Sequence, residues 1–185
     1  SLHGGIAERA HSRMYTELAA RAERIPAQLY IAHNPQALPP AFRALKASGA
    51  AFIHYKTCST FDSSPTVGSI GKAIELGRRV FGNGITPLVV GVPVLGRHVV
   101  FGNLFARSGL DAEPVRLDRH PTMSRHPVTP MDEADIRRHL ARQTNLPIEL
   151  VDVLKLATAR NTRPNVVELT NARQASAIVL FDTLV

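Results

Sequence analysis

Short apolar runs alternate along this chain with segments of helical spacing, and this alternation restricts the fold more than any other feature. Runs typical of strands lie at residues 28–32, 51–57, 86–92, 147–152 and 177–182. Helical spacing of apolar residues lies at residues 6–24, 39–46, 67–80 and 131–144. Apolar strands separated by helices are typical of a parallel sheet. The pattern predicts an α/β fold, a mainly parallel sheet flanked by helices.

The length of 185 residues favours one globular domain, and we treat residues 1–185 as a single domain. Residues 159–174 receive no assignment, because a proline interrupts the helical spacing there. The longest apolar run, ITPLVVGVPVL, is broken by Pro87 and Pro93 and is shorter than the roughly 18 residues of a membrane span. Cys58 is the single cysteine, which rules out an intrachain disulfide and favours a cytoplasmic location. We predict no membrane partner.

The chain is strongly basic, with a formal net charge of +7 and a pI near 10.3. A nucleic-acid-binding domain is one interpretation of such a balance. An anion-binding enzyme domain with a basic surface is another, and we favour it because the arginines concentrate in one segment rich in proline and histidine. The sequence shows no basic helix, zinc-finger spacing or RNA-binding aromatic motif. We therefore predict no nucleic-acid partner.

Residues 59–71, STFDSSPTVGSIG, follow the predicted strand 51–57, and we call them the hydroxyl loop. Six of the thirteen residues carry hydroxyl groups, and Asp62 is the one carboxylate. In a parallel α/β sheet, ligands bind beyond the carboxyl ends of the strands. Hydroxyl groups and free N–H groups at a helix start suit an anion or a polyhydroxy ligand, and Asp62 can accept hydrogen bonds from its hydroxyls. Helix capping explains one such residue rather than six, so we favour a ligand site.

Two more specific functions for this region, a phosphate-binding P-loop and a cysteine nucleophile, are disfavoured. The segment GSIGKA at residues 68–73 lacks the spacing of a phosphate-binding P-loop. Cys58 could act as a nucleophile, but no histidine lies at a recognisable spacing from it, and a lone cysteine at a strand end is more often a packed side chain.

Residues 115–131, VRLDRHPTMSRHPVTPM, form a second segment that we call the cationic loop. Its arginines oppose a single acid: Arg116, Arg119 and Arg125 against Asp118. Three prolines stiffen the loop, and preorganised guanidinium groups suit a carboxylate or a phosphate. His120 and His126 are too few to hold a metal, so we predict none; the alternative role is that each holds the backbone of a turn.

Residues 92–106, VPVLGRHVVFGNLFA, are expected to form a third loop after the predicted strand 86–92. Glycine and asparagine punctuate its apolar run. Arg97 is expected either to reach a ligand or to remain a surface charge. We expect all three loops to meet at the carboxyl edge of one sheet, where they would offer cations to a carboxylate and acceptors to hydroxyl groups.

Three stretches resemble the substrate domain of the four-carbon acid sugar kinases, in the branch associated with threonate-type kinases. They read YKTCSTFDSSPTVGSIGKAIE, VPVLGRHVVFGNLFA and RLDRHPTMSRHPVTPMDEADIRRHLARQT, and the resemblance covers about residues 50–157. It implies a two-domain enzyme whose N-terminal domain binds a four-carbon sugar acid and whose C-terminal domain binds ATP, with Mg²⁺ held by oxygen ligands. It also implies phosphorylation of the 4-hydroxyl group of threonate, erythronate or a 3-oxo derivative.

The sequence departs from this family in two respects. The family's Asp-Asp-x-Thr-Gly-Ala motif, which lies on its first strand, is absent, and no nucleotide domain follows Val185. We therefore expect an incomplete substrate domain without ATP binding or turnover of its own. We also expect self-association, because such a sheet exposes an edge and apolar surface. A stand-alone module that binds or senses small hydroxy acids is the alternative, and a nucleic-acid-binding domain is a third.

The resemblance also implies a set of substrate-binding residues: Lys56, Ser59, Asp62 and Ser63 in the pocket, with Arg119, His120, Arg125 and His126 nearby. Arg97 joins this set from the third loop. The catalytic base is left unassigned, because a candidate acid belongs to the absent first-strand motif.

Overall fold

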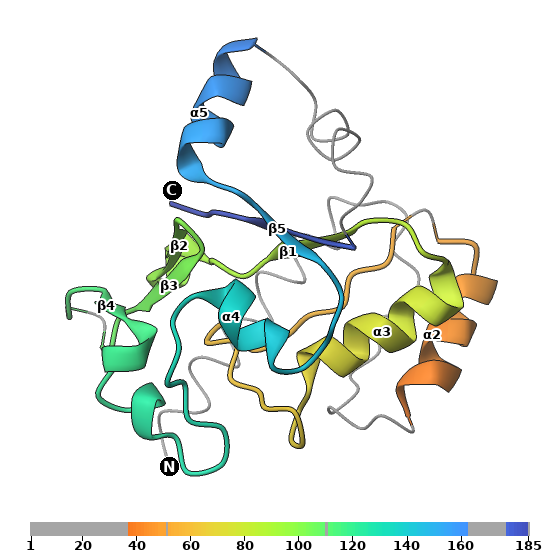
Figure 1. Ribbon diagram of the computed structural model, residues 1–185, viewed down its shortest axis with the longest axis horizontal. Helices are drawn as coiled ribbons and strands as arrows, with labels where there is room; N and C mark the ends of the chain where they lie inside the picture. Colours follow the sequence, from red (N-terminus) through yellow and green to blue (C-terminus); the bar gives the residue numbers. More distant parts are fainter. Residues whose placement is uncertain (1–36, 51, 110, 163–176, 185) are drawn as a thin grey trace.

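The structure of this protein is a computed structural model, in which a parallel sheet, an antiparallel sheet and helices pack together (Figure 1). It describes residues 37–50, 52–109, 111–162 and 177–184. The predicted α/β fold with a parallel sheet is confirmed. The predicted helix at 6–24 and the predicted strand at 28–32 lie outside the described residues.

The parallel sheet consists of β1 (Thr86–Val89), β6 (Ile178–Phe181) and β5 (Ile148–Val151), in that order. All four residues of β6 are buried, as expected for the middle strand between two neighbours. In β1, exposed and half-buried residues alternate, and Pro87 is tolerated because β6 is the one described partner of this strand. Three of the predicted strands are therefore confirmed, although β1 ends earlier than predicted.

The segment predicted as a third loop is instead a hairpin, so that prediction was wrong. It contains β2 (Arg97–Val100) and β3 (Asn103–Ala106), which join β4 (Val115–Arg116) in an antiparallel sheet. Phe101 and Gly102 form the turn with φ values of +49° and +80°. Positive φ at both turn residues matches the twist of the two strands, which explains why Phe-Gly closes a hairpin here.

Asp182 fixes this hairpin to the carboxyl end of the parallel sheet. Its buried carboxylate accepts hydrogen bonds from the backbone N–H groups of Phe101 (2.6 Å), Gly102 (2.8 Å) and Val153 (3.0 Å). The backbone of β2 and that of the residue after Asp182 exchange two further hydrogen bonds of 3.0 and 2.8 Å. The two sheets are thus one continuous scaffold at this edge.

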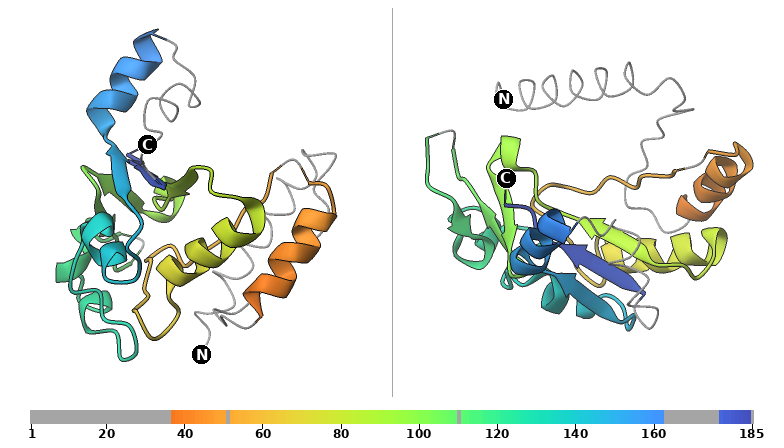
Figure 2. Two further views of the ribbon diagram at one scale, coloured as in Figure 1. Left: turned by 45° about the vertical axis from the view of Figure 1, so that its right-hand side comes forward. Right: turned by 90° about the horizontal axis from the view of Figure 1, so that it is seen from above.

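Helices α2 (Leu38–Ala47) and α3 (Ile70–Phe81) lie side by side away from the hairpin (Figures 1 and 2). The Phe42 ring contacts the rings of Tyr55 and Phe81, with centroids 5.9 and 5.5 Å apart. The helix predicted at 67–80 begins at Ile70, because the Ser69 hydroxyl accepts a hydrogen bond from the Lys72 N–H and caps it.

Helix α4 (Ile136–Ala141) is much shorter than the predicted helix at 131–144, and its acids lie before its first turn rather than within it. Met131 and Ala134 are fully buried in the main core, and the Ala134 carbonyl accepts a hydrogen bond from the backbone of β3. This tertiary contact keeps the backbone out of the helix until Asp135, whose side chain caps it. Helix α5 (Val153–Thr162) follows β5 and was not predicted.

Residues 52–57 carry no strand in the described part of the chain, contrary to the strand predicted at 51–57. Exposed and half-buried residues alternate along them, as in an extended segment. Both sides of β6 are already occupied by β1 and β5, so no place beside the middle strand is open to this segment. Over the described residues, no helix is both long and apolar enough to cross a membrane.

Candidate functional site

Phe61 anchors the hydroxyl loop. Its side chain is fully buried in the main core, and its ring meets the His139 ring edge-on with centroids 6.1 Å apart. Its backbone N–H donates to the Cys58 carbonyl (3.0 Å), and its φ of +56° lies in the left-handed region. Such a conformation costs on the order of 1–3 kcal/mol in a non-glycine residue, which burial of the ring offsets. The turn therefore holds the neighbouring Asp62 in place.

Asp62 is a half-buried carboxylate with hydrogen-bond donors on both oxygens. Oδ1 accepts from the Thr60 hydroxyl (2.6 Å), and Oδ2 accepts from the Thr129 hydroxyl (3.4 Å). Desolvation by burial would raise the pKa of Asp62, but hydrogen bonds from the Cys58 thiol and from Thr60, with His126 nearby, bring it below its usual value. Asp62 is therefore ionised at neutral pH.

The cationic loop meets the hydroxyl loop at Thr129. This residue is buried, and its hydroxyl lies 3.4 Å from Oδ2 of Asp62 and 3.0 Å from Nδ1 of His126. His126 Nδ1 also accepts the backbone N–H of Thr129 (3.1 Å), so the ring holds the turn between them. Two loops that lie 67 residues apart in sequence are thus joined around one carboxylate.

Arg97 is a half-buried residue at the start of β2. Its Nη1 donates to the carbonyls of Leu95 (3.0 Å) and Arg107 (3.2 Å), and its buried Nε has no hydrogen-bond partner among the described residues. Desolvation lowers the pKa of Arg97 and raises that of the Cys58 thiol, which also hydrogen-bonds Asp62. A thiol with a raised pKa is a poor nucleophile. We name Cys58, Asp62, His126 and Thr129 the Asp62 cluster.

The cationic loop has more cations than its own acid can pair. Arg116 forms an ion pair with Asp118 through two hydrogen bonds, and these lower the pKa of Asp118. Arg119 adds an electrostatic contribution to that lowering but makes no hydrogen bond or ion pair within the described chain. The side chain of Arg125 is exposed and likewise makes neither with the described residues. Two guanidinium groups therefore remain available to an anion.

His120 holds the backbone of a turn. The residue is buried, and its Nδ1 accepts the N–H groups of Thr122 (3.2 Å) and Met123 (3.1 Å). Its carbonyl accepts the Ser124 hydroxyl (2.7 Å). This is the alternative that the sequence left open for either histidine, and His126 plays a similar part in its own turn.

Gln143 lies just beyond the end of α4 and binds the N–H groups at the start of α3, which were expected to be free. Its Oε1 accepts the backbone N–H groups of Ile70 (2.8 Å) and Gly71 (3.2 Å), while Ser69 accepts that of Lys72. A Cβ atom on Gly71 would come within 2.7 Å of Gln143, so only glycine permits this approach. The expectation that free N–H groups at this helix start bind an anion was wrong.

Ser63 is buried and turns to the interior. Its hydroxyl donates to the Phe61 carbonyl (3.0 Å), accepts from Nε2 of Gln143 (2.8 Å) and lies 3.0 Å from Nε2 of His139. Burial lowers the pKa of His139, whose Nδ1 has no partner among the described residues. These contacts tie the hydroxyl loop to α4.

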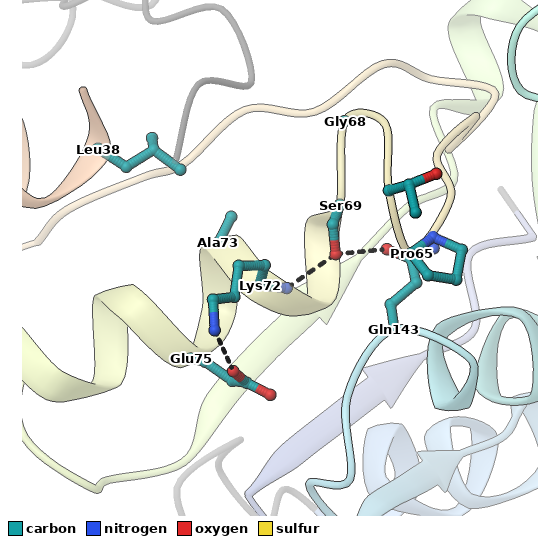
Figure 3. Close-up of a pocket in the computed structure, with 9 residues that line it drawn as sticks. Leu38, Pro65, Gly68, Ser69, Lys72, Ala73, Glu75 and Gln143 are labelled. Carbon is teal, nitrogen blue, oxygen red and sulfur yellow. Dashed lines mark hydrogen bonds and ion pairs between the residues drawn. The ribbon is translucent and has the colours of Figure 1, made fainter. Parts of the chain in front are cut away.

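Two cavities lie along the hydroxyl loop. The larger, of about 400 Å³, is bounded by α3 on one side and by Leu38 and the segment from Pro65 to Ser69 on the others (Figure 3). The smaller, of about 190 Å³, is lined by Ser63, Asp132, His139 and other residues of the loop and α4. Neither is lined by a member of the Asp62 cluster. Of the predicted site residues, Ser63 alone lines one of them.

Two further predicted site residues are Lys56, which precedes the hydroxyl loop, and Ser59, which begins it. Lys56 is exposed and Ser59 is half-buried. Across the described chain, no three His, Cys, Asp or Glu side chains come together as a metal site.

Sequence reasoning missed the residues that connect the loops: Thr60, Thr129, His139 and Gln143. His139 and Gln143 are four residues apart, a spacing that places two side chains on one face of a helical segment. That spacing was a usable signal. Nothing local marks Thr129, whose partner Asp62 lies in another loop.

Comparison with known proteins supplies the family. A family model described as a sugar-binding N-terminal domain matches residues 21–185. A 3-oxo-isoapionate kinase of Paraburkholderia graminis is 58% identical over 122 residues, which are 66% of this chain and 26% of that protein. A 3-oxo-tetronate kinase of Methylobacterium radiotolerans is 35% identical over 140 residues, 76% of this chain and 30% of that protein. The chain thus spans less than a third of the length of either relative.

Solved structures show the same fold. A Haemophilus influenzae protein of a former domain-of-unknown-function family superposes with a TM-score of 0.66 at 24% identity, over 81% of this chain and 34% of that chain. A Bordetella bronchiseptica protein, a domain-swapped dimer with bound citrate, gives a TM-score of 0.55 at 21% identity, over 82% and 33%. With a family match over most of its length, this chain belongs to the sugar-binding N-terminal domains of the four-carbon acid sugar kinases.

Proposed function

We propose that this chain binds the acceptor substrate of an ATP-dependent kinase, a short sugar acid of the threonate, erythronate or 3-oxo type. The family and the names of its kinase relatives support this assignment. The observation that carries it is the Asp62 cluster, where a hydroxyl residue of each of the two loops donates to one ionised carboxylate.

Asp62 would bind a hydroxyl group of the acid. A carboxylate offers about four acceptor sites, and Thr60, Thr129 and the Cys58 thiol use up to three of them. One site remains for a ligand hydroxyl. The lowered pKa of Asp62 makes it a weak base, so its proposed role is to orient the hydroxyl rather than to remove its proton.

Arginine side chains would bind the carboxylate end of the same ligand. Arg119 and Arg125 form no ion pair with the described residues, and guanidinium groups pair with carboxylates in a bidentate manner. Arg97 is held by the backbone carbonyls of Leu95 and Arg107, and its proposed role is to add positive charge to the site. A ligand with a carboxylate and hydroxyl groups matches this combination better than a phosphate or a simple fatty acid.

The described residues do not fit ATP. The Gly68–Ala73 stretch has no P-loop spacing, and the N–H groups at the start of α3 already bind Gln143 and Ser69. We propose that residues 1–185 form one sugar-acid-binding domain and that ATP with its Mg²⁺ binds elsewhere in the kinase. Because phosphoryl transfer depends mainly on positioning and charge neutralisation, binding and orienting the acceptor is a sufficient role for this domain.

A thermal-shift screen tests this function. D-erythronate, L-threonate and butyrate would be compared, since butyrate carries the carboxylate without the hydroxyl groups. A ligand present at 100 times its Kd stabilises the native state by about 2.7 kcal/mol, which corresponds to roughly 5–11 °C for a chain of this size. We expect such a shift with a sugar acid and not with butyrate.

Variants decide whether the shift arises at the proposed site. Arg125→Ala should reduce the sugar-acid shift, whereas Arg79→Ala on the exposed face of α3 should leave it unchanged. Equal shifts with butyrate, or an undiminished shift in the double variant Arg119→Ala/Arg125→Ala, would place acceptor binding elsewhere.

A further inference from the structure

We propose that the larger cavity is a second binding site, one that takes an uncharged polyhydroxy compound such as a sugar or a sugar alcohol. Its volume of about 400 Å³ lies in the range of small-molecule sites. It shares the hydroxyl loop with the Asp62 cluster but none of its residues. The proposal therefore goes beyond the binding of a sugar acid at Asp62.

An ion pair in the wall of this cavity has hydrogen-bond donors and acceptors that the described residues do not use. Lys72 and Glu75 lie one helical turn apart in α3, with Nζ and Oε2 separated by 3.3 Å (Figure 3). Lys72 has three N–H donors and uses one for Glu75. Glu75 accepts that bond on Oε2 and the Thr144 hydroxyl on Oε1 (2.8 Å), which leaves further lone pairs. Adjacent donors and acceptors suit a vicinal pair of hydroxyl groups, each of which donates and accepts.

The rest of the wall combines hydroxyl groups with apolar surface. Thr66 and Ser69 contribute hydroxyl groups, and Leu38, Pro65 and Ala73 contribute carbon atoms. Figure 3 shows Lys72 and Glu75 along α3, with Leu38 on one side of the site and Pro65 and Gly68 on the other. Polyhydroxy compounds present C–H groups as well as hydroxyl groups. Their C–H groups can pack against the apolar residues, and their hydroxyl groups can bind the polar ones.

The charges in the cavity wall disfavour both anionic ligands and fully apolar ligands. The ion pair is neutral overall, and the N–H groups that begin α3 are taken by Gln143. A phosphate or a carboxylate would meet one ammonium group and would be repelled by Glu75. A fully apolar ligand would leave these charged groups desolvated without new partners, which is costly.

An NMR titration of the ¹⁵N-labelled chain tests the proposal, with erythritol and inorganic phosphate as probes at up to about 50 mM. We expect erythritol to shift the backbone resonances of Thr66, Gly68 and Ser69, and phosphate to leave them unchanged. Unmoved resonances with erythritol, or equal shifts with phosphate, would overturn the assignment.

A matched pair of variants locates the site. Lys72→Met should weaken erythritol binding roughly tenfold or more, because it removes a charged donor. Lys155→Met is the control, since Lys155 is equally exposed (47% against 45%) and also pairs with an acid three residues away. Equal effects of the two variants would contradict the proposal. Asp62→Asn should not alter erythritol binding, which separates a failure here from a failure of sugar-acid binding.

Discussion

Replacing Gln143 by leucine should destabilise the protein strongly, because one side chain joins three segments. Its amide oxygen accepts the N–H groups of Ile70 and Gly71, and its amide nitrogen donates to Ser63 and approaches His139 within 3.1 Å. Leucine has a similar volume and none of these groups. The start of α3 would lose these hydrogen bonds, and the hydroxyl loop would keep the contacts of Ser63 and Phe61 with His139.

The size of the effect follows from the two N–H donors that lose their acceptor. Each unsatisfied donor costs about 1–3 kcal/mol when buried, and both lie in a partly buried place, so a total near 3 kcal/mol is expected. Loss of a helix cap alone is worth about 1 kcal/mol. A loss of about 3 kcal/mol lowers the Tm of a chain of this length by roughly 6–12 °C.

Urea unfolding of three variants tests this reasoning. Gln143→Glu keeps an oxygen for both N–H groups and adds a charge that suits a helix start, so it should cost only about 1 kcal/mol. Asn145→Leu, an exposed position two residues away, is the control and should change stability little. If Gln143→Leu and Gln143→Glu lose the same stability, capping by the amide oxygen is not what matters.

Three further predictions concern pH, a buried carboxylate and assembly. Burial lowers the pKa of His139 below its ordinary 6.5. The contribution of the neutral ring to stability is therefore present above pH 6.5 and is lost as the pH falls through the lowered pKa. Between pH 7 and pH 5, the urea midpoint should fall further for the native chain than for His139→Gln. Asp182→Ala should cost about 3 kcal/mol or more in chemical denaturation, because it leaves three backbone N–H groups without an acceptor, and a loss below 1 kcal/mol would contradict this. The chain should self-associate in light scattering, since β1 has a paired neighbour on one side among the described strands; a strictly monomeric mass at high concentration would refute it.

The parallel sheet could be predicted from the sequence because its signal is local. The run IVLF at β6 is apolar at every position, as a middle strand requires, and Ser69 marks the start of α3 three residues before the N–H that it caps. The hairpin was missed because Arg97 and Gly96 made an apolar run look like a loop. The alternating burial of β3 depends on the core against which this strand packs.

The sequence-based predictions that failed at the site have a common cause, which is contact between segments that are distant in sequence. The α4 helix begins late because Ala134 pairs with β3, and the N–H groups of α3 are capped by a glutamine more than seventy residues away. Neither contact leaves a trace in local spacing. The meeting of Asp62 with the cationic loop was expected from topology, yet the residue that makes the contact, Thr129, was not.

Binding of D-erythronate and L-threonate to Asp62→Asn, measured by isothermal titration calorimetry, tests the central claim most directly. Asp111→Asn, which changes an exposed aspartate of the antiparallel-sheet region, is the matched control. Loss of a charged hydrogen bond is worth about 1.5–3 kcal/mol, so Asp62→Asn should weaken sugar-acid binding roughly tenfold to a hundredfold while Asp111→Asn binds as the unaltered chain does. Equal affinity of the two variants for both acids would contradict the account.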